Sequence, residues 1–239
     1  MKLDILAIGV HPDDVELSAS GTLLKHIALG KKAGILDLTR GELGTRGSAA
    51  LRTEEAMRSA KILGLSVREQ LTMADGFFEN NENNQKHIIK VLRKYQPDIV
   101  LCNAITDRHP DHGRAAKLVS DACFYSGLIK IETRSDDNTL QSAWRPKTIY
   151  HYIQDRYLKP DFVVDITPYM DKKMESILAF SSQFFDPNSA EPETPISSKN
   201  FMENIKAKAT IFGRDINCDY AEGFTVERTM GVENLFDLK

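Results

Sequence analysis

Short apolar runs alternate with amphipathic segments over the first 130 residues of the chain. A continuous apolar run, such as residues 5–10, is typical of a parallel strand that is covered on both faces. The segments that follow these runs carry apolar residues at helical spacing, and several of them stop at a glycine or just before a proline. We therefore expect strands at residues 5–10, 33–38, 67–71 and 98–102, and helices at residues 18–29, 52–63, 85–95 and 113–125.

The pattern is less regular beyond about residue 130. Strands are expected at 148–153 and 162–166, helices at 169–180 and 201–212, and an exposed polar loop at 134–145. Residues 184–200 contain three prolines among polar residues, which is typical of a long loop that is either a lid or disordered. The tail around Gly223 and Phe224 indicates neither a helix nor a strand.

Strands that alternate with helices predict βαβ units, a parallel sheet and right-handed crossovers. The expected fold class is α/β: a Rossmann-like three-layer sandwich with a mostly parallel central sheet, in the order 3-2-1-4-5 plus C-terminal additions. We expect one domain over residues 1–239. Its core spans 1–130, and residues 131–239 add the C-terminal strands, the helices and the lid loop.

Composition excludes several classes of protein. The formal net charge is −3 without a basic arm or stripe, which argues against nucleic-acid binding. Three widely spaced cysteines argue against a disulfide framework or a thiolate zinc site, and favour a reducing compartment. The chain enters its first strand without a signal-like segment, and no apolar stretch reaches the roughly 18 residues of a membrane helix. A cytoplasmic protein with no membrane partner is expected.

Two short motifs rich in His and Asp follow two of the expected strands. Residues 11–14 read His-Pro-Asp-Asp, and residues 109–112 read His-Pro-Asp-His. In the order 3-2-1-4-5, the first and fourth strands are neighbours at the point where strand order reverses, which is where such sheets bind ligands. The sheet should therefore bring the two motifs face to face. The glycine-rich fingerprint of a dinucleotide site is missing after the first strand, which argues against NAD or FAD.

The metal ligands expected from these motifs are His11, Asp14 and His112. The offset of three residues between His11 and Asp14 lets one turn aim both side chains at a single point. Imidazole and carboxylate ligands without thiolate suit Zn²⁺ first, with Fe²⁺, Co²⁺ or Mn²⁺ as alternatives. Three protein ligands leave a position open for water, which is typical of a catalytic zinc site.

The other motif residues are candidates for acid–base chemistry. Asp13 lies beside the expected ion without needing to bind it, and is placed to take a proton from water. His109 is left free to act on a reacting carbonyl, with Asp111 as a partner that orients it. Each motif has an ordinary alternative: an aspartate that caps the helix at 18–29, or two histidines of a loop. Their occurrence on two neighbouring strands favours a shared site.

These motifs resemble those of the PIG-L/LmbE family of zinc-dependent N-deacetylases, which act on N-acetylglucosamine (GlcNAc) derivatives. Within the family, the chain is most similar to the deacetylases of N-acetylglucosaminyl malate in bacillithiol biosynthesis. The resemblance covers nearly the whole chain. It rests on the segments 11–16 (HPDDVE), 18–22 (SASGT), 39–47 (TRGELGTRG), 52–55 (RTEE), 107–112 (DRHPDH) and 220–224 (YAEGF).

The resemblance implies a Rossmann-like fold, one zinc ion per chain and a homo-oligomer such as a hexamer. By position, it makes His11, Asp14 and His112 the zinc ligands. Asp13 matches the general base, and His109 matches the residue that stabilises the oxyanion and assists the leaving amine, with Asp111 as its carboxylate partner. Arg52 matches an arginine that engages the sugar or its aglycone.

Further substrate contacts are expected near these motifs. Arg40, Arg46 and Arg108 flank the expected mouth of the site and could pair with an anionic aglycone such as malate, or could be solvated loop residues. Asp75 precedes a glycine and is either a substrate contact or part of a turn.

The function expected is a zinc hydrolase that releases acetate from a GlcNAc conjugate, with N-acetylglucosaminyl malate as the first candidate. A mycothiol-like or chitobiose-like conjugate is an alternative substrate. A metal-binding module without catalysis is the alternative from another class. Asp13 and His109 favour catalysis, because a module that only binds metal would need neither.

Overall fold

Seven strands form one mixed sheet in the computed structural model, which describes residues 1–185 and 190–237. The strands are β1 (Ile5–Gly9), β2 (Ala33–Asp37), β3 (Val67–Gln70), β4 (Ile99–Cys102), β5 (Thr148–Tyr152), β6 (Phe162–Asp165) and β7 (Ala221–Val226). Their order is β3-β2-β1-β4-β5-β7-β6, and all pairs up to β5 are parallel. The predicted order 3-2-1-4-5 is therefore confirmed, and β1 and β4 are neighbours.

The ambiguous tail of the sequence forms β7, which lies between β5 and β6 and runs antiparallel to both. Ala221 to Thr225 are buried, so this strand is covered on both faces like the parallel ones. Its glycine, Gly223, leaves space for the Phe212 ring, because a Cβ there would lie 3.0 Å from two ring carbons. The strand could not be recognised in the sequence, because Glu, Gly and Thr interrupt the apolar run that a buried strand is expected to show.

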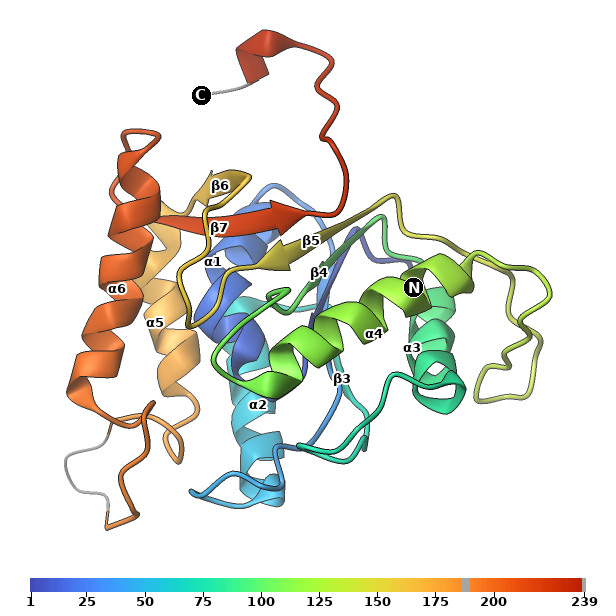
Figure 1. Cartoon of the computed structure of the whole chain (residues 1–239), viewed down its shortest axis with the longest axis horizontal. Helices are drawn as coiled ribbons and strands as arrows, with labels where there is room; N and C mark the ends of the chain where they lie inside the picture. Colours follow the sequence, from blue (N-terminus) through green and yellow to red (C-terminus); the bar gives the residue numbers. More distant parts are fainter. Residues whose placement is uncertain (186–189, 238–239) are drawn as a thin grey trace.

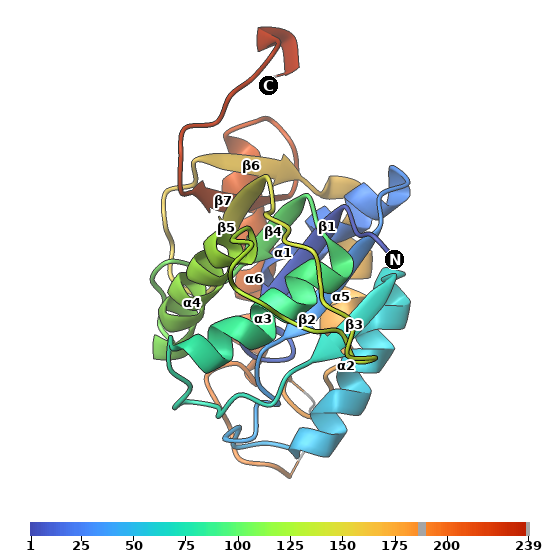
Figure 2. The same ribbon diagram turned by 90° about the vertical axis from the view of Figure 1, so that its right-hand side faces the viewer.

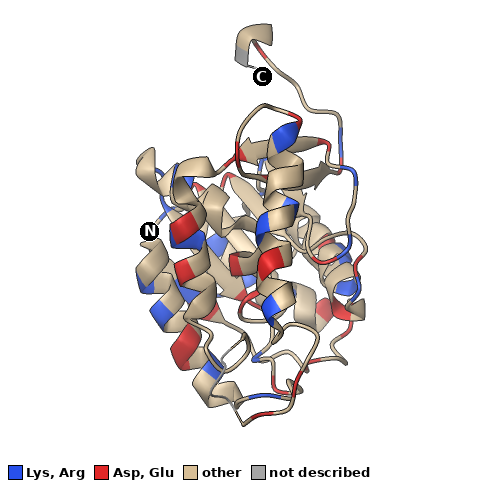
Figure 3. Cartoon of the chain, turned by 90° about the vertical axis from the view of Figure 1, so that its left-hand side faces the viewer, with Lys and Arg blue, Asp and Glu red and all other residues tan. Residues whose placement is uncertain are grey.

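Six α-helices in the described part of the chain cover the sheet. They are α1 (Asp14–Ala28), α2 (Ala49–Leu63), α3 (Glu82–Tyr95), α4 (Pro110–Ser126), α5 (Met170–Leu178) and α6 (Lys199–Arg214). Figures 1 and 2 show α3 and α4 side by side on one face of the sheet, with α1, α2 and α5 on the other. Helix α6 packs beside β6 and β7 at the edge of the sheet. Figure 3 shows acidic and basic residues interspersed over the helices on this side.

Strand β1 shows why the sheet is buried on both faces. Leu6 and Ile8 belong to the core beneath α3 and α4, whereas Ile5 and Ala7 belong to the core beneath α1. Successive side chains of a strand point to opposite faces, so an uninterrupted apolar run is needed when helices cover both.

Several helices begin earlier than their apolar spacing predicts. Helix α1 begins at Asp14 rather than at residue 18, and α4 begins at Pro110 rather than at residue 113. Proline is tolerated in the first turn of a helix because the N–H it lacks would have no partner within the helix. The motif at 109–112 thus forms the N-cap and first turn of α4, whereas the motif at 11–14 is a turn that ends in the first residue of α1.

The C-terminal half differs from expectation in detail. The helix expected at 169–180 is a short 3₁₀ turn, Thr167–Tyr169, followed by α5. Helix α6 begins at Lys199, where Ser198 accepts a hydrogen bond from the backbone N–H of Phe201. Of the loop expected at 184–200, residues 190–198 contain neither helix nor strand, and residues 186–189 lie outside the described part. No helix in the described ranges is long and apolar enough to cross a membrane.

A buried ion pair joins β7 to two helices. Glu222 Oε1 accepts hydrogen bonds from Lys173 Nζ (2.7 Å) and from the backbone N–H of Gly21 (3.0 Å). Its Oε2 accepts one from the N–H of Thr22 (2.7 Å). The side chains of Glu222 and Lys173 are 4% and 2% exposed. This carboxylate therefore fixes α1 and α5 to the antiparallel strand.

Replacing Glu222 by Gln should lower the free energy of unfolding by about 3 to 5 kcal/mol, because the Lys173 ammonium stays buried without a counter-charge. Urea unfolding followed by circular dichroism measures the change. The control is Glu203→Gln, which breaks an exposed pair with Lys199 and should cost less than about 1 kcal/mol. Equal losses in the two variants would contradict this role for Glu222.

Candidate metal centre

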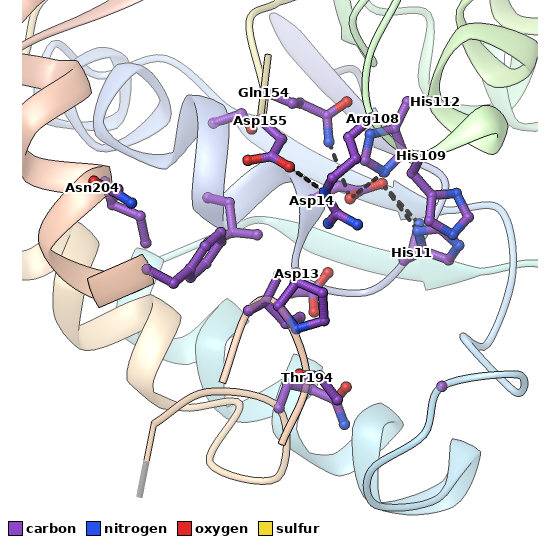
Figure 4. Close-up of a pocket in the computed structure, with 18 of the residues that line it drawn as sticks. His11, Asp13, Asp14, Arg108, His109, His112, Gln154, Asp155, Thr194 and Asn204 are labelled. Carbon is purple, nitrogen blue, oxygen red and sulfur yellow. Dashed lines mark hydrogen bonds and ion pairs between the residues drawn. The ribbon is translucent and has the colours of Figure 1, made fainter. Parts of the chain in front are cut away.

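The ends of β1 and β4 bring the two His/Asp motifs together, as the strand order predicts. The ring centroids of His11 and His109 are 4.8 Å apart, those of His11 and His112 5.7 Å, and those of His109 and His112 5.2 Å. One ring nitrogen from each of the three lies within 4.8 Å of one from each of the others. Figure 4 shows these rings gathered around the carboxylate of Asp14.

Asp14 is the carboxylate at the centre of this cluster. His112 Nε2 lies 3.3 Å from its Oδ1, and His11 Nδ1 lies 3.8 Å from its Oδ2. The three expected ligands therefore present donor atoms to one another. They come from the first turn of α1, the preceding turn and the first turn of α4.

Two amide side chains hold the Asp14 carboxylate in place. Asn103 Nδ2 donates to Oδ2 at 2.9 Å, and Gln154 Nε2 donates to Oδ1 at 3.1 Å. The same Asn103 amide also donates to the Gln154 carbonyl oxygen at 2.9 Å. Backbone N–H groups of Val10 and His11 add two further bonds to Oδ2, each of 3.0 Å. Oδ2 is thus satisfied by protein donors, whereas Oδ1 remains directed toward His112.

Both expected histidine ligands have their second ring nitrogen on a carboxylate. His11 Nε2 lies 2.9 Å from Asp75 Oδ1, and His112 Nδ1 lies 2.5 Å from Asp107 Oδ2. Metal-binding histidines almost always donate their other N–H in this way, which fixes the tautomer and leaves the remaining nitrogen for the ion. The residues present therefore fit a divalent metal bound by His11 Nδ1, Asp14 and His112 Nε2.

The electrostatics of the cluster favour positive charge. Burial disfavours the imidazolium of His11, but Asp14 and Asp75 outweigh it and raise its pKa to about 10. Burial acts in the same direction on His112, and Asp14 and Asp107 raise its pKa to about 9. Burial alone would raise the pKa of Asp14, but His112 and His11 hold it well below its ordinary value. In the protein without metal, protons therefore occupy nitrogens that a divalent cation would use.

Asp13 lies beside the cluster in a strained backbone conformation. Its φ is 121°, a region that residues other than glycine rarely adopt, and it precedes α1 without capping the helix through its side chain. Instead, Oδ2 accepts a 2.9 Å hydrogen bond from Arg52 Nη2. Burial raises the pKa of the Asp13 carboxyl, and the Arg52 guanidinium opposes that rise. The backbone thus directs this carboxylate into the site rather than to the helix end.

Arg52 is a buried partner of the motif. Its guanidinium also donates to the carbonyl oxygens of Pro12 (2.9 Å) and Gly41 (3.2 Å), and the residue is 5% exposed. The contacts of Arg52 place it as a positioning residue for Asp13, although it also lines the cavity where a sugar was expected.

The structure shows other hydrogen-bond partners for the Asp111 carboxylate than the His109 ring. The Asp111 carboxylate accepts hydrogen bonds from the backbone N–H of Gly76 and from Arg114 Nη1, both at 2.8 Å, and its Oδ2 lies 3.8 Å from His11 Nε2. At the start of α4, the backbone N–H of Asp111 instead donates to His109 Nδ1 at 3.3 Å. In a neutral ring this assigns the proton to Nε2. Burial, followed by the charges of His11 and His112, lowers the pKa of His109, so the ring is a neutral donor rather than an imidazolium.

The expected substrate contacts are distributed differently. Asp75 is 6% exposed, and its carboxylate is engaged by His11 and by the backbone N–H of Leu43 (3.0 Å). Arg108 lines the cavity in an ion pair with Asp155. Arg40 is exposed and Arg46 is buried, and neither lines the cavity. Asp75 therefore supports His11, and because it also lines the cavity, its expected contact with substrate stays a prediction.

A cavity of about 580 Å³ extends from the His/Asp cluster to α6. Its far wall is made by residues 194–196 and by one face of α6: Phe201, Asn204, Ile205, Ala207, Lys208 and Ile211. Figure 4 shows Asn204 on α6 across the cavity from Asp155 and Arg108. This wall could not be predicted from the sequence, because the apolar spacing of α6 is equally expected of a helix that packs only on the core. Asn103 and Gln154 were missed for a similar reason, since single amides carry no motif.

The chain is similar to a known protein family and to several known deacetylases. The family model described as "PIG-L: GlcNAc-PI de-N-acetylase" matches residues 6–123. The diacetylchitobiose deacetylase of Thermococcus kodakarensis is 32% identical over 194 residues, which covers 75% of this chain and 70% of that protein. A probable N-acetyl-alpha-D-glucosaminyl L-malate deacetylase 2 of Bacillus anthracis is 26% identical over 197 residues, or 75% of this chain and 81% of that one.

The chain is also similar to a protein with another named reaction. The 4-oxalmesaconate hydratase of Pseudomonas putida is 27% identical over 197 residues, which covers 74% of this chain and 73% of that protein. Among solved structures, the conserved protein TT1542 from Thermus thermophilus superposes with a TM-score of 0.83 and 32% identity, over 97% of this chain and 98% of that one. The match extends over both the sheet and the C-terminal helices.

Replacing Asp107 by Asn should weaken binding of a divalent metal about 10-fold to 100-fold, because His112 loses the carboxylate that orients its ring. Competition between the protein and a fluorescent chelator for Zn²⁺ measures the affinity. Asp155→Asn is the matched control, since Asp155 lines the same cavity but pairs with Arg108 instead of a histidine. An Asp107→Asn protein with unaltered Zn²⁺ affinity would remove this residue from the metal site.

Proposed function

The chain belongs to the PIG-L family, and we propose that it is a metal-dependent hydrolase that removes the N-acetyl group from a GlcNAc conjugate. One observation carries the proposal: Asp13, a buried carboxylate outside the ligand set, is held by Arg52 beside the cluster of His11, Asp14 and His112. A site that only stores metal needs no such carboxylate. A hydrolase needs it as the base for an attacking water.

The chemistry follows from the positions of the side chains. A divalent ion held by His11, Asp14 and His112 would supply Lewis acidity and a water with a pKa near 7. Asp13 accepts the proton of the attacking water, and Arg52 keeps its Oδ2 in place. His109 donates its Nε2 proton in a hydrogen bond to the acetyl oxygen as negative charge develops there. The proton taken up by Asp13 then passes to the amine nitrogen as the C–N bond breaks.

The finer assignment concerns the substrate. We infer N-acetylglucosaminyl malate, the conjugate of bacillithiol biosynthesis, as the first candidate, with Zn²⁺ as the metal. The similarity to a probable malate-conjugate deacetylase supports it. The higher identity to a diacetylchitobiose deacetylase supports a disaccharide as the alternative. The similarity to a hydratase makes it necessary to compare acetate release with hydration.

Asp13→Ala should retain metal and lose at least about a hundredfold in the rate of acetate release, which is the low end for loss of a general base. Acetate is measured by an enzyme-coupled assay, and bound metal by elemental analysis of the same sample. Asp171→Ala, on the exposed side of α5, is the control. An Asp13→Ala enzyme with near wild-type turnover would refute the role given to this aspartate.

Treatment with a chelator should abolish acetate release, and added Zn²⁺ should restore it, because the ligands lose the ion that activates the water. The substrates to compare are N-acetylglucosaminyl malate, diacetylchitobiose and 4-oxalmesaconate. Metal-dependent acetate release from either GlcNAc conjugate supports the proposal. Hydration of 4-oxalmesaconate without acetate release from the conjugates would replace it with a hydratase.

A further inference from the structure

Among the described residues, three Lys and Arg side chains line the cavity, and two of them are paired with carboxylates. Arg52 pairs with Asp13, and Arg108 pairs with Asp155. Lys208 is different: its Nζ donates to the backbone carbonyl oxygen of Asp155 at 3.3 Å. Among the described Lys and Arg residues of the cavity wall, Lys208 is the one that has no carboxylate in an ion pair.

Lys208 is half-buried. Fully buried basic groups of the described chain are stabilised in two ways: Arg93 by carbonyl and hydroxyl oxygens alone, and others by carboxylates. Lys173 pairs with Glu222, and Arg68 pairs with Asp37 and Glu16. A buried cation is expensive to keep unless it is paired and hydrogen-bonded, so these carboxylates are the expected solution. Lys208 has no carboxylate partner, although it lines the same cavity as the proposed reacting groups.

Its position on α6 directs Lys208 into the cavity. Phe201, Ile205, Lys208 and Ile211 recur at spacings of three and four residues, so they share one helix face, and all four line the cavity. Asn204, one turn before Lys208, lies on the same wall opposite Asp155 (Figure 4). An ammonium flanked by Ile205 and Ile211 is in a less polar environment than water, where an opposite charge is bound more strongly.

The acids near Lys208 do not compensate for its burial. Burial lowers the pKa of Lys208, and the nearby charges of Asp155 and Asp107 only oppose that fall. Both acids have other partners, Arg108 for Asp155 and His112 for Asp107. The ammonium has three donors and the structure gives one of them an acceptor, so an acceptor from outside the chain would complete the site.

We propose that Lys208 binds a carboxylate or phosphate on the part of the substrate beyond the amino sugar, so that the enzyme selects GlcNAc conjugates with a negative charge. This proposal rests on the proposed function. It assigns binding of the anionic group to Lys208 on α6, whereas the sequence analysis expects loop arginines to bind it. A cavity of about 580 Å³ is in the size range of sites that bury a small conjugate. Its two ends then have separate tasks, reaction at the strand ends and charge selection at α6.

The test compares anionic with neutral substrates in the Lys208→Met enzyme. N-acetylglucosaminyl malate supplies carboxylates, N-acetylglucosamine 1-phosphate supplies a phosphate, and diacetylchitobiose is neutral. The ratio of kcat/KM for the anionic conjugate to that for the neutral one should fall about tenfold, mainly through KM. The anion that loses more identifies the preferred group. Lys208→Arg keeps the charge and should preserve most of the ratio.

Lys206→Met is the matched control, because Lys206 is on the same helix but exposed and away from the cavity. An unaltered ratio in Lys208→Met, or an equal fall in Lys206→Met, would overturn the proposal. A wild-type protein that releases no acetate from any conjugate refutes the proposed function instead. In that case the affinities of wild type and Lys208→Met for the same three compounds are compared by calorimetry. Equal affinities of the two proteins for the anionic compounds would refute the role of Lys208.

Discussion

The contact between the first turn of α1 and the first turn of α4 is the constraint on which the rest of the site depends. It exists because β1 and β4 are hydrogen-bonded neighbours, so the turns that follow them meet at one edge of the sheet. Asp14 is the side chain at that meeting point. Two side-chain amides hold its carboxylate: Asn103, which follows β4, and Gln154, in the turn after β5. Three adjacent strands therefore fix the orientation of one carboxylate, and a rigid carboxylate is what a metal centre of defined geometry requires.

Support of the histidines comes from different parts of the chain. Asp75 follows β3 and holds His11, while Asp107 precedes α4 and holds His112. The Asp75 carboxylate is itself fixed by the backbone N–H of Leu43 in the glycine-containing loop after β2. The loops after β2 and β3 thus act on the metal site through His11. This accounts for a motif-rich loop at 39–47 whose arginines do not reach the cavity.

The sequence predicted the sheet order and the meeting of the two motifs, because both follow from long-range rules of parallel sheets and from residue types that are easily recognised. It did not predict the local directions of side chains. The Asp111 carboxylate was expected on His109, yet at the second position of α4 it lies beside Gly76 and Arg114. Sequence spacing shows which residues are neighbours along the chain. The residue at which α4 begins determines which backbone N–H donates a hydrogen bond to the His109 ring.

The far wall of the cavity shows the same limit on a larger scale. Helix α6 was predicted from its apolar spacing, but that spacing does not reveal whether the face is covered by core or lines a cavity. Lys208 lies on this face between apolar residues. Its lack of a carboxylate partner is recognised only when each other Lys or Arg of the cavity has been assigned one. Arg52 is engaged by Asp13 and Arg108 by Asp155. If Lys208 binds an anion as proposed, a substrate that spans the cavity presents its amide to the cluster at the strand ends and its negative charge to α6.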